Sequence, residues 1–151
     1  MSELLTPEIQ QWVGRSDPPQ RLEVTRRDIV KYAIATQQRL KKYQDGDEAP
    51  PMFLFNAHQG LVPLKALCPD GLPGDPLLPD LPLKRVMAGG IENTYHQAIR
   101  PGDVLILTRT LTNIYEKSGS TGPLIFVVYT IRVETDSGEP VMDETRTRIF
   151  R

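Results

Sequence analysis

Apolar and alternating stretches separated by turn signals make up the C-terminal half of the chain. Residues 91–99 and 104–115 are rich in Ile, Val, Leu, Thr and Tyr, and they flank Arg-Pro-Gly-Asp at 100–103. Proline presets φ at the second position of a turn and glycine tolerates a positive φ at the third, which predicts a type II turn and a hairpin. Residues 123–134 and 141–150 predict a second strand pair. This half is therefore predicted to be an antiparallel meander.

Helix signals lie in the N-terminal third. Thr6-Pro7-Glu8 combines a capping residue, a proline for the first turn and an early carboxylate, so it predicts the start of a short leader helix within residues 1–20. Residues 21–24 predict a strand. Thr25 followed by Asp28 resembles a capping box and predicts a helix with one apolar face.

The middle of the chain changes character twice. Residues 50–61 begin with two prolines and are apolar almost all round, which predicts a short buried helix. Residues 62–85 then carry a proline every few positions, so they predict a long loop without regular structure. Such a loop can form the wall of a ligand pocket or of a subunit interface, or it can be an ordered crossover without a function.

Composition narrows the possible functions. The 151 residues carry a net charge of −1 and are 39% hydrophobic and 25% charged, which is typical of a single soluble domain. No basic cluster indicates a nucleic-acid partner, and no apolar run is long enough to cross a membrane. One cysteine, Cys68, cannot form an internal disulfide, and no metal-ligand motif surrounds it. The absence of a signal peptide at the start predicts a cytoplasmic protein.

A family resemblance covers most of the chain. It rests on GGIENTYHQAIRPGD at 89–103, the run IYEKSGSTGPLIFVVYTIRVETDSGEPV at 114–141 and TRTRIF at 145–150, together with VTRRDIVKYAIAT and EAPPMFLF upstream. These stretches resemble the N-terminal-half domain of MaoC-like dehydratases and hydratases. The resemblance implies an α+β hot-dog fold over residues 1–151. We therefore expect about five antiparallel strands around a central helix that starts near Pro50, and pairing with a second domain into a double hot-dog.

The resemblance also concerns the catalytic residues. Catalytic members of this family carry an Asp followed five residues later by a His, on the loop after the first helix. The corresponding loop here contains Asp45, Asp47 and Glu48 but no histidine. The two histidines of the chain, His58 and His96, do not restore the spacing. We therefore expect no catalytic residue in this chain, with His58 and His96 as weak candidates.

The function implied by the resemblance is that of a non-catalytic subunit. Such a chain would shape the acyl-CoA pocket of an enoyl-CoA hydratase or 3-hydroxyacyl-thioester dehydratase, while a MaoC-like partner supplies Asp and His. A heterodimer or a dimer of heterodimers is expected, and coenzyme A enters only as part of the substrate, without a further cofactor. A non-catalytic acyl-thioester binding or assembly module is the non-enzymatic alternative. A hot-dog acyl-CoA thioesterase is the enzymatic alternative. Such enzymes commonly carry a carboxylate on the central helix, and residues 52–61 contain none.

The expected substrate contacts follow from the same resemblance. In hot-dog folds the start of the central helix approaches the thioester carbonyl, and its backbone N–H groups can polarise that carbonyl. The glycine pair would allow close approach either to another strand or to the pantetheine chain. For both histidines, a structural hydrogen-bonded role is the alternative. The expected substrate-binding residues are Pro51, Met52, Phe53, Phe55, Asn56, His58, Gly89 and Gly90.

Overall fold

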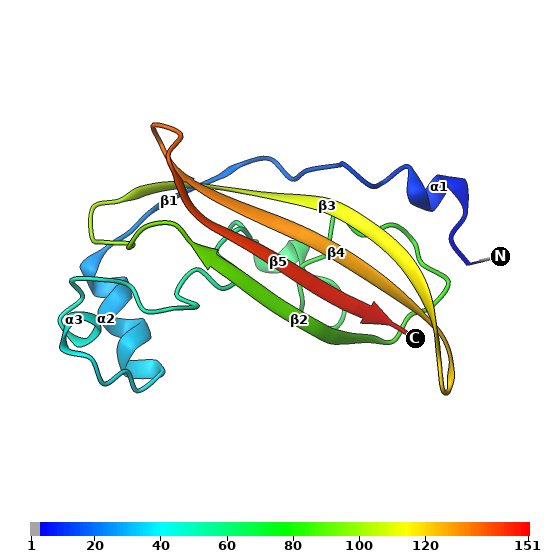
Figure 1. Cartoon of the computed structure of the whole chain (residues 1–151), viewed down its shortest axis with the longest axis horizontal. Coiled ribbons are helices and arrows are strands. Elements are labelled where there is room, and N and C mark those ends of the chain that lie inside the picture. The colour runs from blue at the N-terminus through cyan, green and yellow to red at the C-terminus, as the bar shows by residue number, and fades with distance from the viewer. Residues whose placement is uncertain (1–3) are drawn as a thin grey trace.

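One five-stranded antiparallel sheet dominates the molecule, with strand order β1-β3-β4-β5-β2 (Figure 1). A computed structural model describes residues 4–151; the first three residues of the predicted leader lie outside this range. The predicted α+β class with about five strands is confirmed. In chain order the elements are α1 (Pro7–Gln10), β1 (Gln20–Glu23), α2 (Arg26–Ala35), α3 (Lys41–Gln44), the 3-10 helix η1 (Leu64–Ala66), β2 (Val86–Tyr95), β3 (Val104–Gly119), β4 (Gly122–Thr135) and β5 (Pro140–Phe150).

The pairing of β2 corrects the predicted hairpin. Strands β3, β4 and β5 form the expected meander, but β2 pairs with β5 at the far edge, with Val86 opposite Phe150. The other side of β3 is occupied by β1 and by the leader, whose Gly14 N–H bonds the Leu111 carbonyl at 2.7 Å. No edge of β3 therefore remains for β2. The predicted turn does form, with φ of 89° at Gly102, but it connects distant strands.

The two predicted N-caps are confirmed. The Thr6 hydroxyl accepts a hydrogen bond from the Ile9 N–H at 3.4 Å at the start of α1, and the Thr25 hydroxyl accepts one from the Asp28 N–H at 3.1 Å at the start of α2. Both caps satisfy an N–H group that has no partner within its helix. Ile9 is buried against the sheet, so the leader is part of the folded core.

The predicted central helix is wrong. Residues 50–61, called the turn segment below, form successive turns in which every second N–H from Phe53 to Gln59 bonds the carbonyl three residues earlier, as in Phe55 to Met52 at 3.0 Å. Met52 and Asn56 have φ of 67° and 61°. This left-handed conformation interrupts a right-handed helix. Leu54 still points into the core, so the segment covers the sheet without becoming a helix.

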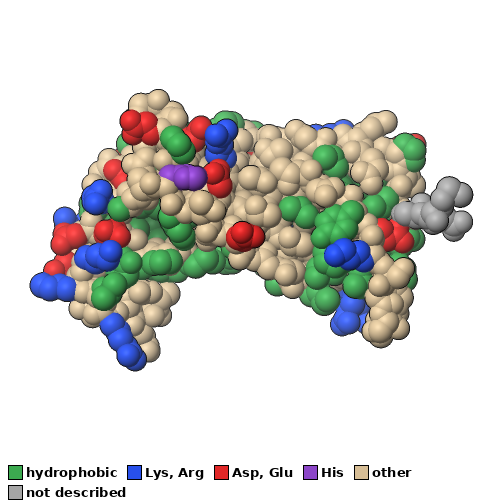
Figure 2. Space-filling view, in the orientation of Figure 1, with side chains coloured by type: hydrophobic (Ala, Val, Ile, Leu, Met, Phe, Trp, Pro, Cys, Tyr) green, Lys and Arg blue, Asp and Glu red, His purple; other side chains and the backbone are tan. Residues whose placement is uncertain are grey.

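The inner face of the sheet holds the buried side chains in two apolar clusters. The first gathers around Leu105, Leu107, Ile131 and Val133 beneath α2, and the second around Leu111, Ile125, Val127 and Leu81 beneath α1 and the loop at 62–85. The outer face, seen in Figure 2, is mostly neither charged nor hydrophobic across its middle, with half-buried threonines at 108, 110 and 147. No helix within residues 4–151 is long and apolar enough to cross a membrane.

Candidate functional site: a polar pocket on the inner face

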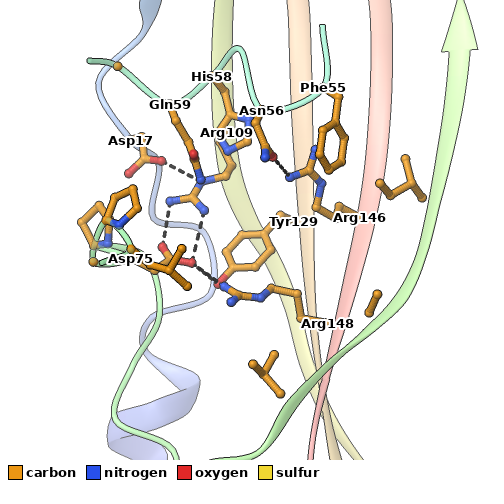
Figure 3. A pocket seen from close by; sticks show the side chains of 18 of the residues that line it. Asp17, Phe55, Asn56, His58, Gln59, Asp75, Arg109, Tyr129, Arg146 and Arg148 are labelled. Carbon is orange, nitrogen blue, oxygen red and sulfur yellow. Dashed lines mark hydrogen bonds and ion pairs between the residues drawn. The ribbon is translucent and has the colours of Figure 1, made fainter. Parts of the chain in front are cut away.

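A cavity of about 710 Å³ lies between the two apolar clusters. Its walls come from the turn segment, the proline-rich segment (62–85), the leader at Asp17, strand β2 and the inner face of β3, β4 and β5 (Figure 3). Its size falls within the range of pockets that hold small ligands. The loop predicted either as a pocket wall or as an idle crossover does line the cavity, through residues 72–76.

Arg109 on β3 forms the centre of a buried ionic network in this pocket. Its side chain is only 9% exposed. The Nε atom donates to Asp17 at 2.7 Å, and Nη2 donates to Asp75 at 2.8 Å. The guanidinium also lies 4.8 Å from the centre of the Tyr129 ring, which is a cation–π contact. A buried cation is stable only when it is paired in this way.

Asp75 connects the proline-rich segment to the sheet. Besides Arg109, it accepts hydrogen bonds from Arg148 Nη1 at 2.9 Å, from the Tyr129 hydroxyl at 3.2 Å and from the Leu77 N–H at 3.0 Å. Burial alone would raise the pKa of Asp75, but the hydrogen bonds and charge of Arg109 outweigh it and the pKa is lowered. Burial, followed by the charge of Asp75, raises the pKa of the Tyr129 hydroxyl. Asp75 is therefore an anion with its lone pairs engaged, and a poor base.

Arg146 on β5 forms a second polar group beside this network. Its Nε donates to Glu144 at 2.8 Å and its Nη1 donates to the Asn56 side-chain oxygen at 2.6 Å. The guanidinium also lies 4.7 Å from the centre of the Phe55 ring. Arg146 thereby connects the turn segment to the sheet, and Figure 3 shows the Asn56 bond beside the Phe55 ring.

His58 lies in the pocket wall with 6% of its surface exposed. Burial, and then the positive charges of Arg109 and Arg146, lower the pKa of its imidazole to about 4. The ring is therefore neutral at pH 7, with one nitrogen that donates and one that accepts. Within residues 4–151 no hydrogen bond joins the ring to another residue, and a structural hydrogen-bonded role for His58 stays a prediction.

The structure divides the residues expected to bind substrate. Phe55, Asn56, His58 and Gly90 line the pocket. The others lie outside it, as follows: Pro51 is exposed, the Met52 N–H bonds the Tyr95 hydroxyl, Phe53 packs on the first apolar cluster, and Gly89 lies against β5.

Gly89 allows close approach of β2 to β5. A Cβ atom there would lie 2.9 Å from Thr147 Cγ2 and 3.0 Å from the Thr147 carbonyl oxygen. The register of β2 and β5 shifts at this point, between Ala88 and Gly90. The close approach is therefore made to another strand.

The second candidate histidine and the loop carboxylates lie elsewhere. His96 follows β2 instead of lying within a strand, and its Nε2 is 2.8 Å from Asp143 on the surface. Asp45, Asp47 and Glu48 pair with Lys41, Arg26 and Lys42 respectively. None of these residues lines the pocket. Within residues 4–151, no group of three or more His, Cys, Asp or Glu side chains could hold a metal ion.

The sequence patterns did not lead us to predict the ionic network, although the sequence contains a signal for part of it. Arg109 has the same alternation as Leu105, Leu107 and Leu111, and Arg148 has the same alternation as Phe150. Side chains two apart in a strand share one face. An arginine in phase with core residues therefore indicates a buried, paired cation. The carboxylates that pair with them, Asp17 and Asp75, lie in loops and carry no such signal.

Comparison with known proteins assigns the family. Residues 11–144 match the model of the FAS1-like dehydratase domain region. The chain belongs to this family. A comparison with curated protein sequences found no significant match.

Solved structures share the fold of this FAS1-like dehydratase domain. The chain superposes on a chain of the ChsH1–ChsH2 complex from Mycobacterium tuberculosis with a TM-score of 0.66 and 17% identity, over 95% of this chain and 86% of that one. The HadBC (3R)-hydroxyacyl-ACP dehydratase complex of the same organism gives 0.63 and 17%, over 91% and 96%. A MaoC-like dehydratase from Rhodospirillum rubrum gives 0.57 and 17%, over 91% of each chain. The predicted hot-dog fold of the MaoC-like dehydratases is thereby confirmed.

Proposed function

We propose that this chain is the non-catalytic subunit of a hot-dog enoyl-CoA hydratase or 3-hydroxyacyl-thioester dehydratase. Its pocket would hold the acyl group while a partner hot-dog chain supplies the catalytic Asp and His. The observation that carries the proposal is the pocket itself, which has ligand-sized volume and extends along β2, at the edge of the sheet. Coenzyme A would enter as part of the substrate, and the reaction would require no further cofactor.

The acid–base chemistry of the pocket supports a role in binding. Hydration of an enoyl thioester needs a group that takes a proton from water and one that gives a proton to carbon. Asp17 and Asp75 are each engaged by Arg109. Five residues after the loop aspartates Asp45 and Asp47 stand Pro50 and Met52, and neither side chain can transfer a proton. Among the titratable side chains that line the pocket, His58 is the one neutral base.

The exposed edge of the sheet at β2 favours the binding of a partner chain. Among the strands of residues 4–151, β2 is hydrogen-bonded only to β5, and it exposes Val86, Met87, Ile91 and Tyr95. An exposed strand edge with apolar side chains is a surface for pairing with another sheet. Val86, Met87 and Ile91 also line the pocket, so a chain seated on this edge would close it. Two of the similar structures, HadBC and ChsH1–ChsH2, are complexes of two different chains.

The test is hydration of a panel of 2-enoyl-CoAs, followed by loss of the enoyl-thioester absorbance. It compares the purified chain, a MaoC-like chain that contains the Asp–His pair, and the two chains co-expressed. Activity of the co-purified complex above that of either chain alone is expected. Full activity of this chain alone would overturn the proposal and would assign catalysis to His58, which His58→Ala would then abolish. Binding of acyl-CoA without hydration in any sample would favour the binding-module alternative.

A further inference from the structure

Arg148 on β5 is the most exposed of the three arginines that line the cavity. Its side chain is 34% exposed, against 9% for Arg109 and 16% for Arg146. The Nη1 atom of Arg148 donates to Asp75 at 2.9 Å, whereas Nε and Nη2 donate to no acceptor within residues 4–151. Both of these atoms remain accessible, whereas Nη2 of Arg146 is buried. A ligand in the cavity can therefore reach donors of Arg148 that its contact with Asp75 leaves unused.

The small residues of β2 leave room beside this arginine. Ala88 lies opposite Arg148 in the pairing of β2 with β5, and Gly90 follows after the register shift. Both residues line the cavity, and a Cβ atom at Gly90 would meet no atom within 4 Å. Asp75 lies on the other side of Arg148, because it also bonds Tyr129 on β4 (Figure 3). The open side of the guanidinium therefore faces β2 and the edge of the sheet.

The ion pairs of the pocket form an alternating series that ends on Arg148. Asp17 pairs with Arg109, and Arg109 pairs with Asp75. Asp75 in turn pairs with Arg148, which has no second carboxylate partner in the described part of the chain. An anion at the open side of Arg148 would continue the alternation, and its nearest charged neighbour would be a cation.

The wall of the cavity carries more positive than negative side chains. Among the described residues, three arginines and two aspartates line it: Arg109, Arg146, Arg148, Asp17 and Asp75. Glu144, which pairs with Arg146, lies outside this lining. After burial, the charges of Arg109 and Arg146 lower the pKa of His58 by more than the charges of the two aspartates raise it. The potential at this wall is therefore positive, which favours an anionic group on a ligand.

We propose that Arg148 binds a carboxylate at the end of the acyl group away from the thioester, so that the substrates are mono-thioesters of dicarboxylic acids. Nε and Nη2 of one guanidinium present parallel N–H bonds, and a carboxylate accepts both at once. The inference rests on the proposed acyl-pocket function and adds the substrate class. An alkyl chain of the same length brings no acceptor to these donors, so the site discriminates against it.

The experiment measures binding, so that it does not depend on turnover. Isothermal titration calorimetry of the full chain, alone and in complex with the MaoC-like partner, compares three saturated acyl-CoAs that cannot be hydrated. These are octanoyl-CoA, ω-hydroxyoctanoyl-CoA and the mono-CoA thioester of octanedioic acid, with the hexanoyl and decanoyl series run in parallel. The carboxylate ligand is expected to bind about tenfold more tightly than the alkyl ligand at the length that reaches Arg148, because hydrogen bonds between charged groups are the stronger ones.

Variants assign the preference to Arg148. Arg148→Gln is expected to remove the tenfold ratio, whereas Arg132→Gln makes the same change at an exposed arginine of β4 outside the pocket and should retain it. Ala88→Glu places a carboxylate opposite Arg148 and should also remove the ratio, while the uncharged Ala88→Gln should retain it. The Ala88 variants keep Arg148 itself, so they test the site even if Arg148→Gln does not fold.

Three results would overturn the inference while the acyl pocket stands. These are equal binding of the alkyl and carboxylate ligands at every length, equal binding of the hydroxylated and carboxylate ligands, and a ratio that survives Arg148→Gln or Ala88→Glu. A ratio shown by the chain alone but lost in the complex would assign Arg148 to a carboxylate of the partner, and it too would overturn the inference. If none of the ligands binds to either sample, the acyl pocket and the inference are both wrong.

Discussion

Asp75 and Arg109, 34 residues apart in the chain, form a two-pronged ion pair, with Nη2 and Nη1 of the arginine 2.8 and 3.3 Å from the two carboxylate oxygens. This pair joins the proline-rich segment to β3. Because the segment has almost no regular structure, its position over the sheet depends on such contacts and on Leu77 and Leu81, which are buried beside Asp75. Asp75 is therefore the polar anchor of this pocket wall, beside the two buried leucines.

Removal of that carboxylate should destabilise the protein strongly. We expect Asp75→Ala to lower the free energy of unfolding by about 3 kcal/mol, because Arg109 stays buried with half of its ion pairs lost. Urea denaturation followed by circular dichroism measures this. Asp80→Ala is the matched control: Asp80 lies in the same segment with an exposed pair to Lys84, so its loss should change stability by less than about 1 kcal/mol. Equal effects of the two variants would contradict the structural role of Asp75.

Stability should fall between pH 7 and pH 5 because of His58. Its pKa is about 4 in the folded protein and near 6.5, the ordinary value of histidine, when unfolded, so in this window the unfolded state binds the additional proton. Stability is therefore present at higher pH and decreases as the pH falls, by about 2 kcal/mol between pH 7 and pH 5 for this group. Urea unfolding at both pH values should show a smaller pH effect in His58→Phe than in the wild type or in His96→Phe. An unchanged pH effect in His58→Phe would show that His58 is not held neutral by the fold.

A methyl group at Gly89 should separate β2 from β5. Its Cβ would meet backbone and side-chain atoms of Thr147 at 3.0 Å or less, and overpacking of this kind costs about 1–3 kcal/mol. Gly74→Ala is the control, because its nearest neighbour would be Cys68 Sγ at 3.7 Å. Thermal unfolding should give a lower midpoint for Gly89→Ala than for Gly74→Ala. The same midpoint for both would mean that β2 can move away from β5 without cost.

Charge on the exposed edge should prevent assembly. Ile91→Glu places a carboxylate on β2, where Ile91 is 41% exposed, and we expect it to abolish co-elution with the catalytic partner because an unpaired charge would be buried in the interface. Ile34→Glu makes the same change on α2, where the side chain is 73% exposed, and should leave the complex intact. Size-exclusion chromatography with light scattering distinguishes these outcomes. A complex that survives Ile91→Glu would place the partner on another surface.

Local sequence signals predicted the elements better than their partners. The caps at Thr6 and Thr25 and the glycine turn at Gly102 depend on neighbouring residues, and all of them form. The pairing of β2 with β5 instead of β3 depends on the leader, which occupies the edge of β3 through backbone bonds that carry no side-chain signal.

The turn segment shows a second limit of prediction from the sequence, which concerns backbone conformation. Its composition suits a buried helix, but Met52 and Asn56 adopt left-handed backbone conformations that composition does not specify. Tertiary bonds accompany these conformations, from the Met52 N–H to Tyr95 and from Arg146 to Asn56. The pocket residues supplied by this segment, Phe55 and His58, could be named in advance, whereas the ionic network that they face requires the fold.

The ionic network has a consequence for how the strands align. Tyr129 and Arg148, on neighbouring strands, both bond Asp75. A slip of β5 by two residues would keep every inward side chain facing inward, so the alternation of apolar and polar residues does not oppose it. The slip would move Arg148 by about 7 Å along the sheet, away from its carboxylate. The network thus favours one alignment of β4 and β5 through contacts that the alternation of apolar and polar residues does not specify.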